Sequence, residues 1–153
     1  MFRHLTVSAL FLALALPGAV MAHSFSQGDI RVMHPWASVA ATGASSPVYM
    51  TLTNAGTEPD KLLAVEAKAA GRVEIQKAKK GSGATSYETI PAVDLGAKKT
   101  VQMQPGGMRV LLSDLKEPLR HEYTVPLTLV FERSGRVEIQ VVIQKSAAEG
   151  HTH

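Results

Sequence analysis

The sequence predicts an all-β fold, a sandwich or barrel of short antiparallel strands, and three observations support this prediction. Short runs rich in valine, isoleucine, leucine and threonine recur along the chain, and turn-forming glycine, proline and asparagine separate them. No stretch shows the apolar period of a long helix. Hydrophobic residues make up 45% of the chain and charged residues 19%, which is typical of a globular domain and not of a disordered chain.

Each expected strand is a run of alternating or β-branched residues bounded by turn residues. Pro35 ends the first run, Asn54-Ala55-Gly56 turns the chain after the second, and Pro105-Gly106-Gly107 separates two later ones. Residues 113–121 are the one segment that could hold a helical turn. In chain order, the expected strands cover residues 30–34, 48–53, 62–66, 72–76, 87–90, 100–104, 108–112, 127–131 and 136–144.

One hexapeptide, Gly-Arg-Val-Glu-Ile-Gln, occurs twice, at residues 71–76 and 135–140. Two copies do not make a repeat protein. Because side chains alternate along a strand, the pattern predicts two edge-type strands. Each would bury its valine and isoleucine and expose its arginine, glutamate and glutamine.

Residues 1–22 predict a signal peptide that is removed on export. Arg3 precedes an apolar run, and Val20-Met21-Ala22 places small residues at the −3 and −1 positions of a cleavage site after Ala22. The alternative is a membrane anchor, but the apolar run is much shorter than the roughly 20 residues that span a bilayer. We therefore expect an exported protein with no stable membrane insertion after cleavage.

The composition excludes several kinds of site. The chain has no cysteine, which excludes disulfides, zinc-thiolate sites, iron–sulfur clusters and thiol catalysis. Its 16 basic and 13 acidic residues give a net charge of +3, too small and too evenly spread to indicate nucleic acid. The carboxylates are scattered, Ser45-Ser46 lacks partners with a recognisable spacing, and Gly81-Ser82-Gly83 opens no helix. We therefore expect no enzyme activity.

Six stretches keep a common order and spacing along nearly the whole exported part of the chain, and in them the sequence resembles the periplasmic copper chaperones of the PCu(A)C family. The resemblance implies a domain over residues 23–145 with a cupredoxin-like β-sandwich, and a periplasmic location. It also implies carriage of Cu(I) towards a copper enzyme such as cytochrome c oxidase or another copper carrier. The stretches are Pro35-Trp36-Ala37, Val48 to Gly56, Val73-Glu74-Ile75, Val101 to Gly107, Leu115 to Leu119 and Val125 to Phe131.

The family binds copper through a His, a Met about eleven residues on, and a His-x-Met pair about 22 residues further. On this sequence these positions are Gln76, Tyr87, Arg109 and Leu111, and none of them is a family ligand. Cu(I) prefers imidazole and thioether donors, whereas a guanidinium has no lone pair and repels a cation. We expect a polar patch in which Arg109 stacks on Tyr87, bonds Gln76, or accepts an anion or a partner's carboxylate. The alternative is that these are plain surface residues.

Copper could instead be held by other residues. Cleavage after Ala22 would make His23 the first residue, and its α-amine and imidazole could together chelate Cu(II) in a brace-like site. A second imidazole could come from His34, His121, or His151 and His153 of an expected flexible tail, residues 146–153. A copper oxygenase built on such a brace is conceivable, but the small sandwich and the lack of an aromatic binding face argue against it.

His34 and His121 have simpler interpretations: His34 is expected to cap or pack in the sandwich, and His121 to lie on the surface. Met103 and Met108 flank the Pro-Gly-Gly turn and could supply a thioether pair, although a packing role is the simpler prediction. Met50 is expected in the core. Two functions follow. The first is a protein that buffers or delivers copper, as Cu(I) or Cu(II), through an altered site. The second is a metal-free interaction module that lost copper binding.

Overall fold

The computed structural model describes residues 24–81 and 83–145, and in this part of the chain every regular element is a strand. The all-β prediction is therefore confirmed, while the helical turn expected within residues 113–121 is wrong. None of the described residues forms a helix long and apolar enough to cross a membrane. The strands are β1 (Ser24–Gln27), β2 (Ile30–Ser38), β3 (Ser46–Asn54), β4 (Asp60–Glu66), β5 (Ala70–Lys79), β6 (Ser86–Thr89), β7 (Val93–Leu95), β8 (Thr100–Met103), β9 (Met108–Leu115), β10 (Thr124–Phe131) and β11 (Gly135–Gln144).

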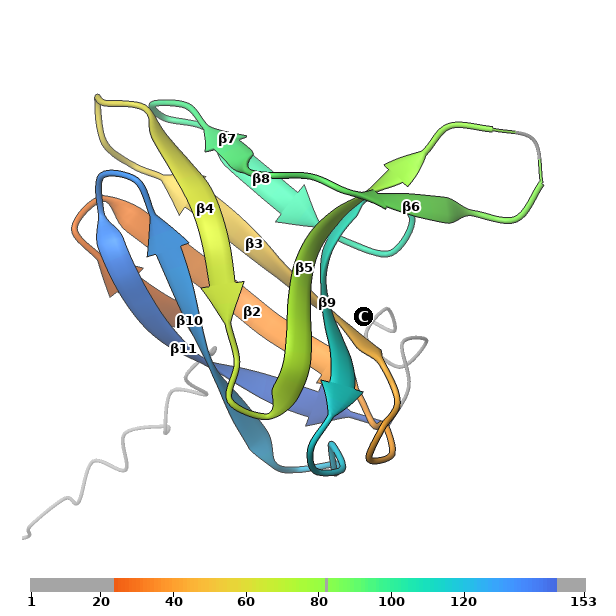
Figure 1. Cartoon of the computed structure of the whole chain (residues 1–153). Coiled ribbons are helices and arrows are strands. Elements are labelled where there is room, and N and C mark those ends of the chain that lie inside the picture. Colours follow the sequence, from red (N-terminus) through yellow and green to blue (C-terminus); the bar gives the residue numbers. More distant parts are fainter. Residues whose placement is uncertain (1–23, 82, 146–153) are drawn as a thin grey trace, which may run out of the picture.

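The strands form one curled sheet that closes on a single apolar core. Their order is β6-β5-β9-β3-β2-β11-β10-β4-β7, with β1 added to β2 and β8 added to β3. Figure 1 shows β4 and β10 lying in front of β2 and β3, while the β5–β6 hairpin projects from one side of the sheet. The core is built from the inward residues of both halves, among them Val32, Leu52, Leu129 and Ile139, each at most 1% exposed.

Nearly all neighbouring strands are antiparallel, as predicted, but β2 and β11 are parallel, with Trp36 opposite Val142. These two strands lie at opposite ends of the described chain, and no hairpin connects them. A parallel pair needs a long crossover connection, and the alternation of side chains within a strand carries no information on strand direction. The local pattern therefore could not predict this pairing.

Strand β2 does not end at Pro35. It continues to Ser38, and the β2–β3 register shifts between Met33 and Trp36. His34 takes a positive φ of 50° at this shift. Met33 is paired with Thr51 and Trp36 with Tyr49, so two β2 residues stand against one residue of β3, which defines a β-bulge. Proline is tolerated at a bulge because the ladder is interrupted there.

The two copies of the hexapeptide occupy different environments. In β11 the pattern holds, since Val137 and Ile139 are at most 2% exposed while their neighbours point to solvent. However, β11 lies between β10 and β2 and is not an edge strand, so that part of the prediction is wrong. In β5 the prediction is wrong on two points. The strand lies between β6 and β9 and is not an edge, and Gln76, which was expected to be exposed, is only 9% exposed and bonded to Arg109.

The Asn54-Ala55-Gly56 turn is held in place by hydrogen bonds of the Asn54 side chain. Asn54 is 1% exposed, and its side-chain amide donates to the carbonyl oxygens of Glu58 and Leu95 at 2.7 and 3.1 Å. Its Oδ1 accepts from the Gly56 amide at 3.0 Å. Every polar atom of this buried amide side chain is thus paired, and the loop is tied to β7.

Asp60, at the start of β4, is a second buried polar anchor. Its carboxylate is 6% exposed and accepts hydrogen bonds from the Lys61 and Arg133 amides and from the Ser134 amide and hydroxyl, at 2.6–3.1 Å. Burial by itself raises the pKa of a carboxyl. At Asp60 the Ser134 hydroxyl and these backbone donors outweigh burial, and the pKa lies below its ordinary value.

Candidate functional site

The four positions that the family resemblance marks for copper come together on the outer face of the sheet. Gln76 and Arg109 are directly opposite each other in the β5–β9 pair. Leu111 follows two residues along β9, on the same face, because side chains alternate along a strand. The intervening Val110 is fully buried in the core. Tyr87 comes from β6, which pairs with the C-terminal end of β5.

Arg109 is engaged by both of the partners that the sequence suggested. Its Nε donates to Gln76 Oε1 at 3.0 Å. Its Cζ lies 3.5 Å from the centroid of the Tyr87 ring, within the range of a cation–π contact. The predicted stacking and hydrogen bond are therefore confirmed. The guanidinium occupies the centre of the family-equivalent site.

Two aromatic residues extend this cluster across β3 and β2. Tyr49 is 5% exposed, and its ring lies 5.0 Å from that of Trp36, with an angle of 41° between the planes. Burial raises the pKa of Tyr49, and the neighbouring Tyr87 adds to the increase. The charge of Arg109 and a hydrogen bond from it oppose the increase without cancelling it. Tyr49 is therefore a neutral phenol at physiological pH.

Further hydrogen bonds hold the residues around this cluster in place. The Tyr87 hydroxyl accepts from the Gly106 amide at 3.3 Å, so the Pro105-Gly106-Gly107 turn is tied to β6. Glu74 Oε1 accepts from the Thr89 hydroxyl at 3.2 Å, and Glu74 Oε2 accepts from Gln76 Nε2 at 3.5 Å. Gln76 therefore bridges a cation and an anion, and its orientation is determined on both sides.

This donor set does not fit copper. Leu111 has no donor atom, Gln76 offers only an amide oxygen that already accepts from Arg109, and the phenol of Tyr87 lies under the guanidinium. Arg109 carries a permanent positive charge at the place where a cation would have to bind. Across residues 24–81 and 83–145, no group of three or more His, Asp or Glu side chains could hold a metal ion.

The two methionines beside the Pro-Gly-Gly turn lie in different environments. Met103 is 3% exposed in the core, and its β-sheet partner is Met50. Met108 is half-buried, packs against the edge of the core and stands opposite Lys77. Met50 is thus the strand partner of Met103, while the thioether pair of Met103 and Met108 stays a prediction. The sequence had no signal for the pairing of Met50 with Met103 beyond the β-rich run that contains Met50.

His34 differs from its expected packing role. Its side chain is exposed at the β2 bulge. A positive φ is uncommon for residues with a side chain, and His34 is one of four such non-glycine residues in the described part of the chain. His34 lines a shallow cavity of about 220 Å³ together with Trp36, Met50, Thr51, Gln102, Met103, Gln104 and Pro105.

The remaining histidines contribute no site in the described chain. His121 is exposed, as expected, and its Nδ1 lies 4.0 Å from Glu122 Oε1. His23, His151 and His153 lie outside the described residues, so their roles as copper ligands stay predictions. The signal peptide of residues 1–22 and the tail of residues 146–153 also lie outside them.

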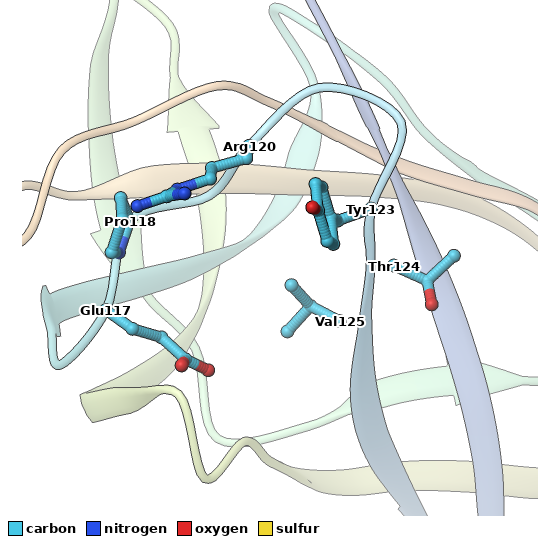
Figure 2. Close-up of a pocket in the computed structure, with 6 residues that line it drawn as sticks. All are labelled: Glu117, Pro118, Arg120, Tyr123, Thr124 and Val125. Carbon is cyan, nitrogen blue, oxygen red and sulfur yellow. The ribbon is translucent and has the colours of Figure 1, made fainter.

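Another cavity, of about 270 Å³, opens between the end of β9 and the start of β10. Figure 2 shows the Tyr123 ring across the cavity from Pro118, with Arg120 and Glu117 on the sides between them. The remaining lining residues are Thr124 and Val125. This cavity has no imidazole or thioether in its wall and offers a soft metal no suitable donor.

Comparison with known families and proteins gives the fold a context. The family described as "Putative lipoprotein LpqE-like" matches residues 30–143. A curated relative, "Putative lipoprotein Lxx21020" of Leifsonia xyli subsp. xyli, is 23% identical over 150 residues, which cover 94% of this chain and 90% of the relative.

Several solved structures have a similar fold, and PCuAC domains are among them. The apo PCuAC domain of PmoF1 is 32% identical, with a TM-score of 0.70 over 81% of this chain and 100% of that domain. The copper-bound PCuAC domain of PmoF2 is 27% identical, with a TM-score of 0.69 over 81% and 99%. Cu(I)-bound DR1885 of Deinococcus radiodurans is 25% identical, with a TM-score of 0.59 over 85% and 87%. The expected cupredoxin-like fold of PCuAC domains is thereby confirmed.

Proposed function

This chain belongs to the LpqE-like family, and we propose that it is an exported copper-binding protein that buffers or delivers copper through a site other than the family-equivalent one. Two of the domains that it resembles are described as copper-bound. Because Arg109 occupies the family-equivalent site, copper must use other ligands. The exposed His34 on the β2 bulge is the observation that carries this proposal.

Strand β1 begins beside the β2 bulge. The two strands pair antiparallel from Gln27 opposite Ile30 to Ser24 opposite Met33, the residue before His34. The sequence places His23 immediately before Ser24, although His23 itself lies outside the described residues. The ligand set of His23 and His34 is therefore part of the proposal, and the titrations below test it.

Cleavage after Ala22 would complete the site. The new α-amine and the imidazole of His23 would supply two nitrogens, and the imidazole of His34 would supply a third. Three nitrogen donors with open positions suit the tetragonal preference of Cu(II). The exposure of His34 leaves the ion accessible to another protein. Handover of copper, with no catalytic step, fits this arrangement best.

Export of the protein is supported by the signal-peptide pattern and by the family description as lipoproteins. We do not extend the lipid modification of lipoproteins to this chain, because these 153 residues contain no cysteine to bear the lipid. The periplasm is the compartment that the PCu(A)C resemblance implies. A copper enzyme such as cytochrome c oxidase, or a second copper carrier, is the partner class that we propose.

A Cu(II) titration of the signal-cleaved protein tests this function. We expect His23→Ala and His34→Ala each to weaken Cu(II) binding at least about tenfold, or roughly 1.4 kcal/mol. The matched control His121→Ala removes an exposed imidazole elsewhere and is expected to change nothing. Adding two residues before His23 keeps its imidazole but moves the α-amine, and is expected to weaken binding as much as His23→Ala.

Two results would contradict the brace. Full Cu(II) affinity in both His23→Ala and His34→Ala would exclude these ligands, and a loss on deleting residues 146–153 would then assign the ion to His151 and His153. No stoichiometric binding of either copper ion would leave the metal-free interaction module. In that module Gln76 and Tyr87 would hold the guanidinium of Arg109 through its Nε and one face, and its terminal NH groups would be the donors for a partner's carboxylate.

A further inference from the structure

We propose that the cavity beside the β2 bulge is a separate binding site for Cu(I), formed by the imidazole of His34 and the thioethers of Met50 and Met103. The three residues line the same cavity of about 220 Å³. This inference shares His34 with the proposed Cu(II) site but requires neither His23 nor cleavage of the signal peptide.

The sheet register brings the three residues into one row. Across the bulge, His34 and Pro35 are the two β2 residues that stand against Met50, because the pairs on either side join Met33 to Thr51 and Trp36 to Tyr49. Met50 is in turn directly opposite Met103 in the β3–β8 pair. The row therefore crosses three adjacent strands, and directly opposite residues lie close enough for their side chains to meet.

The bulge makes His34 accessible to this row. In a regular strand, alternation would assign successive residues strictly to the core face or the solvent face. A bulge re-aims a side chain by inserting an extra residue. Pro35 is the buried member of the bulged pair and His34 the exposed one. The cavity wall thus combines the exposed His34 with two methionines that are at most 3% exposed.

The chemistry of the lining selects a soft monovalent ion. None of the eight lining residues is an Asp, Glu, Lys or Arg. Hard divalent ions prefer carboxylate and carbonyl oxygens, whereas thioether and imidazole donors suit Cu(I). Neutral donors also match an ion of single charge. Methionine has three rotatable bonds and a polarisable sulfur, so it can turn towards an ion without moving the backbone.

This site adjoins the Arg109 cluster through Trp36, which packs against Tyr49 and lines the cavity, but Arg109 itself is not part of it. Met50 and Met103 lie on the core side of β3 and β8, whereas Tyr49 and Arg109 lie on the outer side. The cavity contains neither Arg109 nor Tyr87 among its lining residues. The charge that excludes copper from the family-equivalent positions is therefore not in its wall.

Anaerobic titration with Cu(I) against a chromophoric competitor tests the proposal on the signal-cleaved protein. Met→Leu conserves volume and usually costs less than about 1.5 kcal/mol, so these variants should stay folded. We expect Met50→Leu and Met103→Leu each to weaken Cu(I) binding at least about tenfold and to leave Cu(II) binding unchanged. The control Met108→Leu removes a thioether outside the cavity and is expected to change neither affinity.

The same titrations keep this proposal distinct from the proposed function. Loss of Cu(II) binding in His23→Ala with Cu(I) binding intact supports both sites. Intact Cu(II) binding in His23→Ala overturns only the brace. Unchanged Cu(I) affinity in the Met50→Leu/Met103→Leu double variant overturns the thioether site, as does X-ray absorption of the Cu(I)-loaded protein without sulfur in the coordination shell. Circular dichroism checks that the double variant is folded. If it is not, the absorption spectrum of the unmutated protein decides.

Discussion

The guanidinium of Arg109 lies over the ring of Tyr87, with 3.5 Å between its Cζ and the ring centroid. These residues come from β9 and β6, and they occupy two of the four positions that the PCu(A)C resemblance marks for copper ligands. An internal cation thus stands where related domains would place a metal ion. The cluster holds its charge with an aromatic face and an amide oxygen, which are weak donors for copper but good partners for arginine.

Removing this cation is expected to destabilise the fold. Arg109→Ala deletes the cation–π contact and leaves the buried Gln76 amide without its donor, at a cost of about 1–3 kcal/mol in the free energy of unfolding. Urea denaturation measures this change. Arg72→Ala is the control, because Arg72 is exposed and its Nε lies 3.9 Å from Glu74. Equal losses in the two variants would mean that the Arg109 contacts add nothing specific.

Restoring the family's ligands should restore the family's site. The variant Gln76→His, Tyr87→Met, Arg109→His, Leu111→Met places imidazole and thioether donors on strands that already bring these positions together. We expect it to gain Cu(I) affinity at the outer face by at least about a hundredfold, or roughly 2.7 kcal/mol.

The background for this measurement is Met50→Leu/Met103→Leu, which removes the proposed cavity site. The three-residue variant that keeps Arg109 is the control and should gain nothing, since the guanidinium still repels the ion. A gain with Arg109 present would show that its charge does not block copper.

The bulge conformation of His34 leads to a stability prediction. At a φ of 50°, a β-branched side chain is strained, whereas glycine is not. We expect His34→Val to cost about 1–2 kcal/mol, and His34→Gly to stay within about 0.5 kcal/mol of the original, because relief of strain offsets the entropy of glycine. Thermal unfolding monitors both. If His34→Val is as stable as His34→Gly, the positive φ carries no strain.

The lowered pKa of Asp60 predicts a loss of folding stability at acidic pH. Its pKa is lowered in the folded protein, so the folded state binds this proton more weakly than the unfolded chain does. The contribution of Asp60 is therefore complete above the unfolded pKa of about 4 and is lost as pH falls through the folded pKa.

We expect Asp60→Asn to be less stable at neutral pH by about 1–3 kcal/mol and to lose less stability on acidification. Denaturation midpoints between neutral and acidic pH measure both effects. Asp94→Asn is the control, because the Asp94 side chain is 88% exposed and forms only a 3.6 Å ion pair with Lys61. If Asp60→Asn loses as much stability on acidification as the original protein, Asp60 does not determine the stability at acidic pH.

Much of the fold could be predicted from local patterns. The strands around Val48–Thr53 and Arg136–Gln144 lie where alternation and turn residues place them. The polar strand β1 and the three-residue β7 could not be predicted, because β1 has one apolar residue and β7 is too short to show a period. The contacts of Arg109 with Gln76 and Tyr87 were predicted through the spacing of a known family, and the structure confirms them.

The sequence by itself determined the all-β class, the absence of thiol chemistry and the loss of the family's copper donors, since these depend only on residue types and their order. The tertiary structure decided the parallel β2–β11 pair, the bulge at His34 and the pairing of Met50 with Met103. Alternation specifies which side chains face the core, but not which distant strand becomes the neighbour. That choice is made by the whole sheet as it closes around its core, and here it places His34, Met50 and Met103 in the wall of one cavity.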